Sequence, residues 1–528
     1  MRDTASEVRD TAIRAYRAVR AYTLRSVRTA RQRWRTASPR ERQTAVVTAG
    51  SAVLGLVVAV VAVAATGPWD SGQRTAERAW AASQDRGSGA KHTGGAGDGR
   101  GPAPEDAPDV LGALGADAAD EPTRGPGSGN VPPPTSSALA DALEPLLKDA
   151  ALGPVRSASV VDAATGRKLY TVGAGVAATP ASTVKLATAV AALSARGDGH
   201  RIETRAVRGG GGSVVLVGGG DPTLDADGIR EIAKETARSL KKADKGGGAP
   251  EVSVGYDTSR YKGTTQHPIS PNENIAAVTP LMVNEGRLDG SDHGPAPRSA
   301  DPARDAAEDF AEALERQGVE VEGGPERAGA PARAKELGDH RSAPLSELVE
   351  RMLTNSDNDI AEALARQTAL AKGEEPSFAG AETAVRRELD RLGLPVQGAR
   401  FPDGSGLDRA DKVSAGLLTQ LLARAADPGR TELRSVLTGL PVAGFTGTLE
   451  ERYGDEQNKP GAGLVRAKTG TLTGINTLAG TVVDADGRLL AFAFMTSGTK
   501  DAEGAKNALD RMASALANCG CRDSPSSG

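Results

Sequence analysis

The chain is poor in cysteine and histidine. Its two cysteines, Cys519 and Cys521, lie in a Cys-Gly-Cys stretch close to the C-terminus, so no set of disulfides can organise the fold. Outside a cell this pair could be oxidised, but a ring that small is strained, and we interpret it as a terminal feature and not as a redox centre. The histidines lack the spacing of metal ligands; they are His92, His200, His267, His293 and His340. We therefore predict no metal centre and no cofactor.

Net charge is also scarce. The chain has 64 Lys and Arg against 68 Asp and Glu, a formal net charge of −4. This balance hides a basic segment at residues 1–44, where arginine recurs at every third position in Arg14, Arg17 and Arg20. Such a segment can bind nucleic acid or anionic lipid, or it can mark the cytoplasmic side of a membrane protein. The segment that follows favours the membrane interpretation, so we expect no nucleic-acid partner.

Residues 45–66 contain no charged side chain and consist mainly of Ala, Val, Leu and Gly. A helix of about 21 residues is roughly 31 Å long, which is enough to cross the hydrocarbon core of a bilayer. The arginines on its N-terminal side place residues 1–44 in the cytoplasm and the remainder outside. We predict a single-pass signal anchor in the cell membrane with an extracytoplasmic catalytic domain. The alternative is secretion after cleavage near Ala62-Val63-Ala64.

Residues 67–135 lack large apolar side chains almost entirely and are rich in Gly, Ala, Pro, Asp and Ser. A segment of this composition cannot bury enough apolar surface to offset the entropy lost on ordering, and it is predicted to be a disordered tether. The folded domain is predicted over residues 136–518, and residues 519–528 form a C-terminal tail. The chain shows no internal repeat.

The first chemical motif lies at the start of an apolar run. Ser182 and Lys185 are three residues apart in a segment that is predicted to be helical, so both side chains lie on one face. A serine hydroxyl is a weak nucleophile unless a base removes its proton, and a lysine can serve when burial lowers its pKa. On its own this spacing is weak, because it also arises by chance at a surface serine and lysine.

Two later motifs make the interpretation specific. Ser356-Asp357-Asn358 lies ahead of an apolar helical run, and Lys468-Thr469-Gly470-Thr471 lies in a strand-like stretch. The order Ser-x-x-Lys, Ser-Asp-Asn, Lys-Thr-Gly is the signature of penicillin-binding proteins and serine β-lactamases. The chain resembles these proteins in all three motifs.

The elements around the motifs fit that resemblance. Periodicity predicts a helix at 136–151, a β-hairpin at 158–172, a second hairpin at 476–496 and a closing helix at 501–517. Strands from both chain ends can then complete one mostly antiparallel sheet. We predict an α/β fold of the penicillin-binding protein/serine β-lactamase type, with an antiparallel sheet flanked by helices and a helical subdomain. An inserted subdomain, at about 205–340, contains strands at 214–217 and 251–257 and a helix at 227–241.

Four stretches together resemble one family. They are Gly-Gly-Gly-Asp-Pro-Thr-Leu at 218–224, Ser-Asp-Asn-Asp-Ile-Ala-Glu at 356–362, Asp-Gly-Ser-Gly-Leu at 403–407 and Lys-Thr-Gly-Thr at 468–471. The resemblance is to the D-alanyl-D-alanine carboxypeptidase/endopeptidases of the PBP4 (DacB) type, peptidase family S13, and it covers about 140–517. The interval from Ser182 to Ser356 is shorter than in the larger members, so one of their extra domains is expected to be trimmed or absent.

The resemblance implies an acyl-transfer mechanism on peptidoglycan stem peptides. Ser182 would attack the carbonyl of a D-Ala-D-Ala terminus, release D-Ala and form an acyl-enzyme that water hydrolyses. Lys185 would be the base for acylation, although the identity of this base in the superfamily is disputed. Ser356 would relay a proton to the departing amine, and Asn358 would hold the substrate's amide. β-Lactams mimic D-Ala-D-Ala and are expected to acylate the same serine.

The third motif is expected to bind the substrate. Lys468 would present a positive charge and Thr469 a hydroxyl to the terminal carboxylate of the peptide, and Gly470 would allow the backbone to approach the substrate. The backbone N–H groups of Ser182 and Thr471 would form the oxyanion hole. These assignments describe a serine carboxypeptidase that could also act as an endopeptidase.

Two acidic positions near the motifs have structural interpretations. Asp403-Gly404-Ser405-Gly406 has the composition of a tight turn, which we favour over a direct catalytic role. Asp357 is expected to orient its motif and not to react.

Four alternatives are weighed against the serine peptidase. A serine β-lactamase shares the motifs, but the interval between Ser356 and Lys468 shows no acidic loop of the kind that class A enzymes use for deacylation, and the insertion is foreign to them. A non-catalytic penicillin-recognising sensor or scaffold should have lost motif residues, and none is lost. The basic N-terminus could be a cytoplasmic module with the rest as its receptor. A zinc D,D-peptidase is disfavoured by the missing ligand pattern.

Overall fold

The computed structural model describes residues 132–243 and 249–520, which fall within one compact unit. The predicted basic segment, signal anchor and nearly all of the tether lie outside these residues, as does Cys521. Among the described helices, none combines the length and the apolar character needed to cross a membrane.

The centre of the catalytic domain is a five-stranded sheet in the order β12-β13-β14-β1-β2. All four pairings are antiparallel, and the pairing of β1 with β14 joins opposite ends of the folded domain, for example Val160 with Phe492. Both predicted hairpins are therefore confirmed, and the third motif lies on the edge strand. The strands are β1 (Val155–Asp162), β2 (Lys168–Val172), β12 (Val465–Leu472), β13 (Ile475–Val483) and β14 (Leu489–Ser497).

Side-chain size differs between the two faces of this sheet. Phe492 and Phe494 point to one face, where α4 (Ser136–Leu147) and α13 (Ala502–Ala517) complete an apolar core. Alternate residues of β14 point to the other face because successive side chains of a strand alternate. There Ala491 and Ala493 are small, so α11 (Ala415–Ala425) and the nucleophile helix can pack closely against the sheet.

A helical lobe covers this second face. The segment 181–193 is buried almost throughout, but Ser182 lies in a 3₁₀ turn, η2 (Ala181–Val184), and Lys185 is the first residue of the α-helix that follows. The helices of this lobe are α5 (Lys185–Arg196), α8 (Leu345–Asn355), α9 (Asn358–Lys372), α10 (Phe378–Arg391) and α12 (Ser435–Thr438). Smaller elements are β3 (Ala177–Ala178), which pairs with β11 (Val413–Ser414), and the 3₁₀ turns η1 (Ala150–Leu152), η5 (Thr431–Leu433), η6 (Gly447–Leu449) and η7 (Lys459–Gly461).

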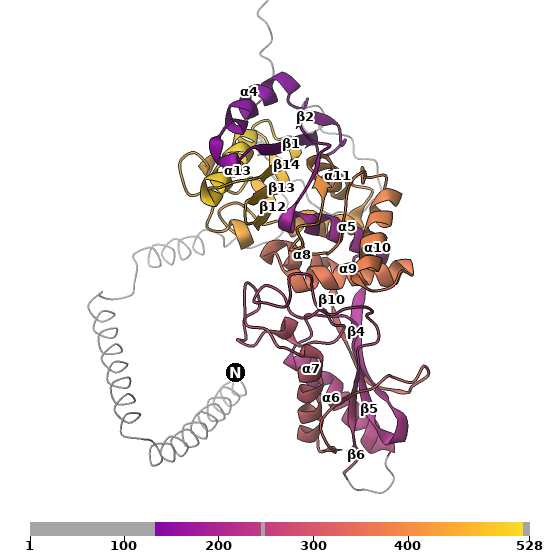
Figure 1. Ribbon diagram of the computed structural model, residues 1–528. Helices are drawn as coiled ribbons and strands as arrows, with labels where there is room; N and C mark the ends of the chain where they lie inside the picture. The colour runs from indigo at the N-terminus through magenta and orange to yellow at the C-terminus, as the bar shows by residue number, and fades with distance from the viewer. Residues whose placement is uncertain (1–131, 244–248, 521–528) are drawn as a thin grey trace, which may run out of the picture. The chain divides into compact units, whose positions relative to one another are not determined.

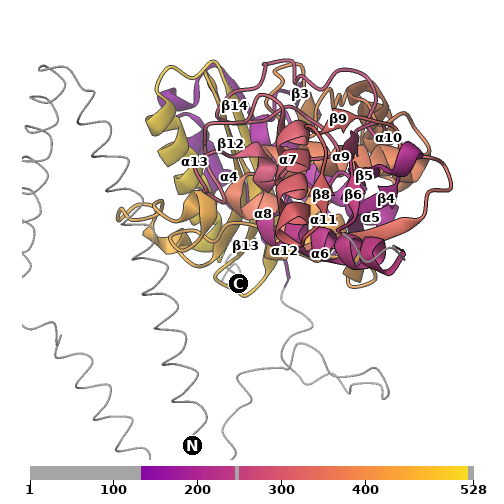
Figure 2. The same cartoon turned by 90° about the horizontal axis from the view of Figure 1, so that it is seen from below.

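The insertion between the first two motifs forms a second sheet with its own apolar core. Its strand order is β10-β4-β5-β7-β9, and α6 and α7 pack together beside it (Figures 1 and 2). The predicted strand at 251–257 is two short strands, β6 and β7, because the chain changes partner between them. The elements are β4 (Arg201–Arg208), η3 (Gly210–Gly212), β5 (Val214–Val217), α6 (Ala226–Ala243), β6 (Glu251–Val252), β7 (Val254–Asp257), η4 (Asn284–Gly286), α7 (Pro302–Arg316), β8 (Glu320–Val321), β9 (Glu326–Arg327) and β10 (Glu336–Pro344).

The insertion is attached to the helical lobe through its first and last strands. β4 and β10 pair with each other over residues 201–207 and 336–344, a few residues beyond the predicted range of 205–340. They leave the lobe directly below α8 and α9 (Figure 1). The long loop from 258 to 300 returns from the insertion toward the second motif, and this return shapes the active site.

Candidate active site

Ser182 is held in a tight turn by the loop that contains Asp403. Its neighbour Ala181 has a φ of 49°, a left-handed conformation that is strained for alanine. Gly406 packs against this turn so closely that a Cβ atom there would lie 2.1 Å from the carbonyl oxygen of Ala181. The turn that carries the nucleophile is therefore clamped by backbone contact with a second loop.

Lys185 connects the first two motifs. Its Nζ atom donates to Ser182 Oγ at 3.0 Å, to Asn358 Oδ1 at 2.7 Å and to the carbonyl oxygen of Ser405 at 2.6 Å. The side chain has no solvent exposure, and burial lowers the pKa of Lys185 to about 8, although the nearby carboxylates, Asp403 first, favour the charged form. A lysine with such a pKa can accept a proton from a hydroxyl near neutral pH.

Ser356 and Asn358 lie at the junction of α8 and α9. Ser356 ends α8 in a left-handed conformation, with φ 59°, which turns its side chain toward the third motif. Asp357 caps α9 by accepting a hydrogen bond from Ile360 N at 2.9 Å, which agrees with an orienting role. Asn358 is fixed at both ends of its amide, because its Nδ2 atom also donates to the carbonyl oxygen of Asn274 at 2.9 Å.

Lys468 is buried behind the cleft. Its Nζ atom donates to Ser356 Oγ at 2.9 Å and to the carbonyl oxygen of Thr469 at 2.9 Å. Burial lowers the pKa of Lys468 well below its usual range, and the neighbouring charge of Lys185 acts in the same direction. The sequence predicted that Lys468 presents a fixed charge to the substrate's carboxylate. The structure instead places its amine against Ser356.

Gly470 is needed for packing within the protein. A Cβ atom at this position would lie 2.2 Å from Thr477 Oγ1 and 2.6 Å from the carbonyl oxygen of Pro180. The close approach is thus between β12 and the nucleophile turn, and not only between backbone and substrate as the sequence suggested. Thr469 Oγ1 donates to Thr448 Oγ1 at 2.9 Å, which ties β12 to the turn η6.

The three motifs meet at a cleft of about 230 Å³. Ser182 and Thr471, whose N–H groups the sequence assigned to the oxyanion hole, both line it, together with Ser356 and Asn358. All predicted site residues are therefore brought together at or directly behind one cleft.

The residues that form this cleft lie within a stretch that matches a known family. The family described as D-Ala-D-Ala carboxypeptidase 3 (S13) matches residues 139–291 and 289–519. The chain belongs to this family.

Curated relatives extend over most of the S13 domain. A carboxypeptidase of Mycobacterium tuberculosis is 36% identical over 402 residues, which is 74% of this chain and 85% of the relative. The D-alanyl-D-alanine carboxypeptidase of an Actinomadura species is 31% identical over 446 residues, or 68% of this chain and 81% of the relative. The crystal structure of penicillin-binding protein 4 (dacB) from Haemophilus influenzae has a TM-score of 0.57 at 22% identity, covering 71% of this chain and 97% of that one, and shows the same fold. The chain is a serine D-Ala-D-Ala carboxypeptidase.

Sequence analysis missed the role of a histidine in this S13 site. His267 Nε2 lies 2.8 Å from Asp403 Oδ2, and both side chains are fully buried. Asp403 also accepts hydrogen bonds from the backbone of Gly406 at 2.6 Å and Asp408 at 2.8 Å, so it organises the tight turn that was predicted there. The pKa of Asp403 is lowered despite its burial, chiefly by the hydrogen bond with His267.

This histidine is part of a group that the spacing of histidines in the sequence could not reveal. Ligand atoms of His267, Glu362 and Asp403 lie within 4.8 Å of one another, which is the geometry of a possible cation site. However, Glu362 Oε1 already accepts hydrogen bonds from Gly404 N and Ser405 N, at 2.9 Å and 3.0 Å. We interpret the group as a buried network that supports the loop whose carbonyl contacts Lys185.

A second buried network comes from the insertion. Arg287 Nε donates to Glu285 Oε2 at 2.7 Å, and an Arg287 Nη2 atom lies 3.8 Å from Asp357 of the second motif. Arg298 Nη1 lies 2.9 Å from Asp359. Burial raises the pKa of Glu285 to about 8 and that of Asp359 to about 7, with the neighbouring Asp357 adding to both shifts. The loop at 258–300 therefore supports the second motif through charged contacts that the three motifs do not signal.

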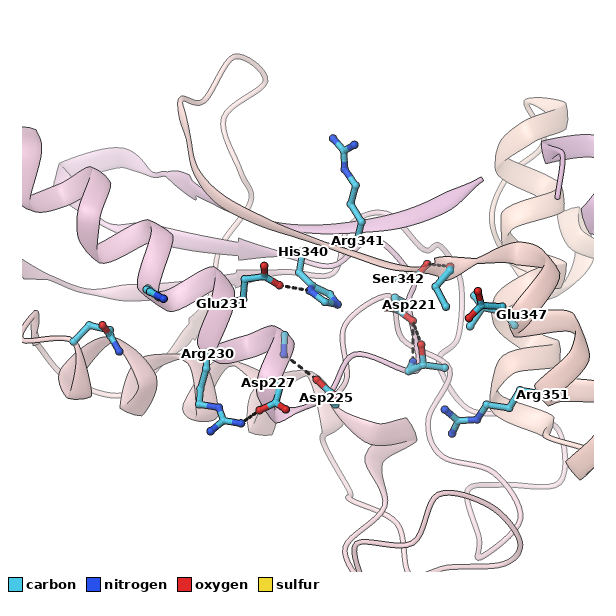
Figure 3. A pocket seen from close by; sticks show the side chains of 16 residues that line it. Asp221, Asp225, Asp227, Arg230, Glu231, His340, Arg341, Ser342, Glu347 and Arg351 are labelled. Carbon is cyan, nitrogen blue, oxygen red and sulfur yellow. Dashed lines mark hydrogen bonds and ion pairs between the residues drawn. The ribbon is translucent and has the colours of Figure 1, made fainter. Parts of the chain in front are cut away.

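The Gly-Gly-Gly-Asp-Pro-Thr-Leu stretch lies away from the catalytic cleft. Asp221 accepts two hydrogen bonds from Thr223 and lines a cavity of about 860 Å³ between α6, β10 and α8. Figure 3 shows two ion pairs there, Arg230 with Asp227 and His340 with Glu231, the latter at 2.9 Å. A Cβ atom at Gly219 would lie 1.9 Å from the carbonyl oxygen of Glu203, so the glycines permit close packing of the insertion.

Proposed function

We propose that Ser182 is the nucleophile of this carboxypeptidase and Lys185 the base that activates it. The observation that carries the proposal is the 3.0 Å hydrogen bond between Lys185 Nζ and Ser182 Oγ, made by an amine that is buried and has a pKa of about 8. At pH 7 roughly a tenth of such amines are neutral and able to accept the serine proton.

In acylation, Ser182 Oγ forms a bond with the carbonyl carbon of the penultimate D-Ala, and its proton passes to Lys185. The tetrahedral oxyanion is stabilised by the backbone N–H groups of Ser182 and Thr471, and loss of one such donor typically costs about 100- to 1,000-fold in rate. The bond to the terminal D-Ala nitrogen then breaks. Ser356, hydrogen-bonded to Lys468 at 2.9 Å, relays the proton held by Lys185 to the leaving amine, which leaves Ser356 protonated and Lys185 neutral.

In deacylation, a water molecule gives a proton to the neutral Lys185 as its oxygen bonds to the ester carbon. The bond to Ser182 Oγ then breaks, and Lys185 passes that proton to Oγ, which restores the serine hydroxyl. Lys468 is buried, whereas Thr469 is half-buried and Thr471 is exposed. The hydroxyls of these two threonines are therefore the groups of the third motif that can contact the substrate's carboxylate. Asn358 is held by Lys185 and Asn274 in a fixed orientation for contact with the peptide amide. Peptidoglycan stem peptides that end in D-Ala-D-Ala are the proposed substrates.

β-Lactams are proposed as covalent inhibitors that acylate Ser182. A structure of the Haemophilus influenzae relative holds a novel β-lactam. The test is intact-mass spectrometry of the full chain after addition of benzylpenicillin, with Ser182→Ala as the control. A lasting adduct in the wild type alone supports the proposal, whereas an adduct of equal yield in Ser182→Ala contradicts it. Rapid loss of penicillin without an adduct would point to a β-lactamase.

Release of D-Ala from a D-Ala-D-Ala peptide, compared with cleavage of a cross-linked peptide dimer, separates carboxypeptidase from endopeptidase activity. The substrate lies outside the cell membrane, which is consistent with the proposed location: an N-terminal anchor at 45–66 with residues 1–44 in the cytoplasm. Protease protection of residues 1–44 in sealed cells would support the anchor, and recovery of a mature chain without residues 45–66 from the medium would contradict it.

A further inference from the structure

A cavity of about 430 Å³ lies at the base of the insertion and shares one lining residue, Arg341, with the pocket of Figure 3. Figure 3 shows the side chain of Arg341 rising from β10 on the side opposite to His340, as the alternation of a strand requires. The cavity is lined by polar and charged side chains from β4, β10, α9 and the loop after β7. The polar and charged side chains of the lining are His200, Arg201, Glu203, Arg260, Arg341 and Gln367.

Positive charge predominates in this cavity. Three arginines face one carboxylate, Glu203, whose Oε1 atom accepts a hydrogen bond from Arg341 at 3.2 Å. Arg201 donates only to a backbone carbonyl, that of Ser342, at 2.8 Å. Within residues 132–243 and 249–520, the guanidinium of Arg260 has no hydrogen bond or ion pair. Arg341 also pairs with Asp339, outside the lining, at 3.4 Å. Arg201 and Arg260 are thus the two arginines of the lining without a carboxylate partner in the described residues.

A fourth guanidinium lies directly behind the lining. Arg196 Nη2 donates to Gln367 Oε1 at 3.1 Å, and its Nε atom donates to the carbonyl oxygen of the same residue at 3.2 Å. Burial lowers the pKa of Arg196, and the charge of Arg260 lowers it further. Burial likewise lowers the pKa of His200, with Arg196 and Arg260 adding to the effect. These cations are close enough to repel one another.

We propose that this cavity is a binding site for a doubly charged oxyanion of the phosphate type. Guanidinium groups recognise phosphate oxygens through paired, charge-assisted hydrogen bonds, and the anion would remove the repulsion between the arginines. A dianion matches the uncompensated charge of the lining. The volume exceeds that of a bare ion, so the group is expected to be a phosphomonoester on a larger molecule.

The site is separate from the cleft at Ser182. Lys185 and Arg196 are separated by roughly 16 Å along α5, and Asn358 and Gln367 by roughly 14 Å along α9. The occupant of the cavity would therefore not compete with a β-lactam. This separation lets binding be tested independently of the proposed catalytic mechanism.

The experiment is calorimetric titration of the full chain with inorganic phosphate, and then with glycerol phosphate, at low ionic strength. Chloride at matched ionic strength is the reference. We expect Arg260→Gln to weaken phosphate binding by about tenfold or more, the usual effect of losing a charge-assisted hydrogen bond. Lys262→Gln removes an exposed charge two residues away, outside the lining, and should change the affinity by less than about twofold. Equal weakening in both variants, or no binding beyond that of chloride, would overturn the proposal.

A second readout follows His200 directly. Phosphate should raise the pKa of His200 in an NMR titration, because an anion would offset the charges of Arg196, Arg260, Arg341 and Arg201 that outweigh Glu203. A His200→Asn variant identifies the resonance among the five histidines. An unchanged His200 pKa at saturating phosphate would contradict binding at this place. Acylation by benzylpenicillin, measured in parallel, shows that each variant is folded, and its failure would concern the catalytic mechanism and not the anion site.

Discussion

Lys468 Nζ lies 2.9 Å from Ser356 Oγ, so the second and third motifs meet in one buried hydrogen bond. The three hydrogen bonds of Lys185, to Ser182, Asn358 and Ser405, form a separate group beside this contact. A lysine whose pKa burial has lowered can exchange a proton with a serine more readily than an exposed one.

This pairing predicts non-additive effects of mutation. Ser356→Ala and Lys468→Ala should each reduce kcat/KM for D-Ala release by roughly 100- to 1,000-fold, because each removes one end of the same relay. The kcat/KM of the double variant should lie within about threefold of that of the less active single variant, as expected for residues that act as a unit. Multiplicative losses in the double variant would show that the two residues act separately. Lys262→Ala serves as a lysine control.

The lowered pKa of Lys185 predicts how acylation depends on pH. The neutral amine is the reactive form, so the second-order rate of acylation by benzylpenicillin should rise with pH and level off above about 8. Lys185→Ala should reduce the rate by several orders of magnitude. Stopped-flow measurements from pH 6 to pH 9.5 test this. A rate that is constant over the whole range would exclude Lys185 as a base with this pKa.

Gly470 provides a steric test. Gly470→Ala would place a Cβ atom 2.2 Å from Thr477 Oγ1 and 2.6 Å from the carbonyl oxygen of Pro180, which forces β12 away from the nucleophile turn. We expect the rate of acylation to fall by about 100-fold. The free energy of unfolding should fall by about 1–3 kcal/mol, the usual cost of overpacking.

The matched control for this steric test is Gly175→Ala, because a Cβ atom there would meet no other atom within 4 Å. It should leave both acylation and thermal unfolding unchanged. Wild-type activity in Gly470→Ala would mean that the approach of β12 to Pro180 is not required.

The buried pair of His267 and Asp403 predicts a pH-dependent contribution to stability. Burial opposes the charged form of His267, but the hydrogen bond with Asp403 and the charge of Glu362 prevail and raise its pKa. A raised histidine pKa gives stability that is fully present below the unfolded value of about 6.5 and is lost as pH rises through the folded value.

His267→Gln should therefore destabilise the protein more at pH 6 than at pH 9, as measured by urea unfolding against the wild type. His293→Gln is the control, because His293 is exposed and its side chain pairs only with Asp292. An equal loss at both pH values for His267→Gln would show that the ring acts through packing alone.

The sequence predicted which residues meet at the cleft because each motif is local. Ser182 and Lys185, or Lys468 and Gly470, are separated by two residues or fewer, and the helix and strand that carry them have clear periodicity. The same pattern predicted both hairpins of the central sheet and led to the expectation that strands from both chain ends share one sheet. The specific pairing of β1 with β14 was not predicted, because no local signal marks it.

Residues that act through distant contacts could not be predicted in this way. His267 and Asp403 are 136 positions apart, and no local pattern marks either as a partner of the other. Arg287 belongs to an irregular loop whose path depends on how the insertion folds back on the second motif. Lys468 was assigned a substrate-binding role from the motif, whereas its burial depends on the packing of β12 against η2 and η6, which only the tertiary structure supplies.

The central sheet also makes activity depend on completion of the chain. Ser182 is made early, but three of the five strands, starting with β12 at Val465, lie in the last part of the sequence. β1 must wait for β14, more than 300 residues later, and such long-range pairing folds slowly. A polypeptide whose synthesis stops early would carry the nucleophile without Lys468 or the strand that supports it. Hydrolysis therefore requires that synthesis has continued through β14, which ends at Ser497.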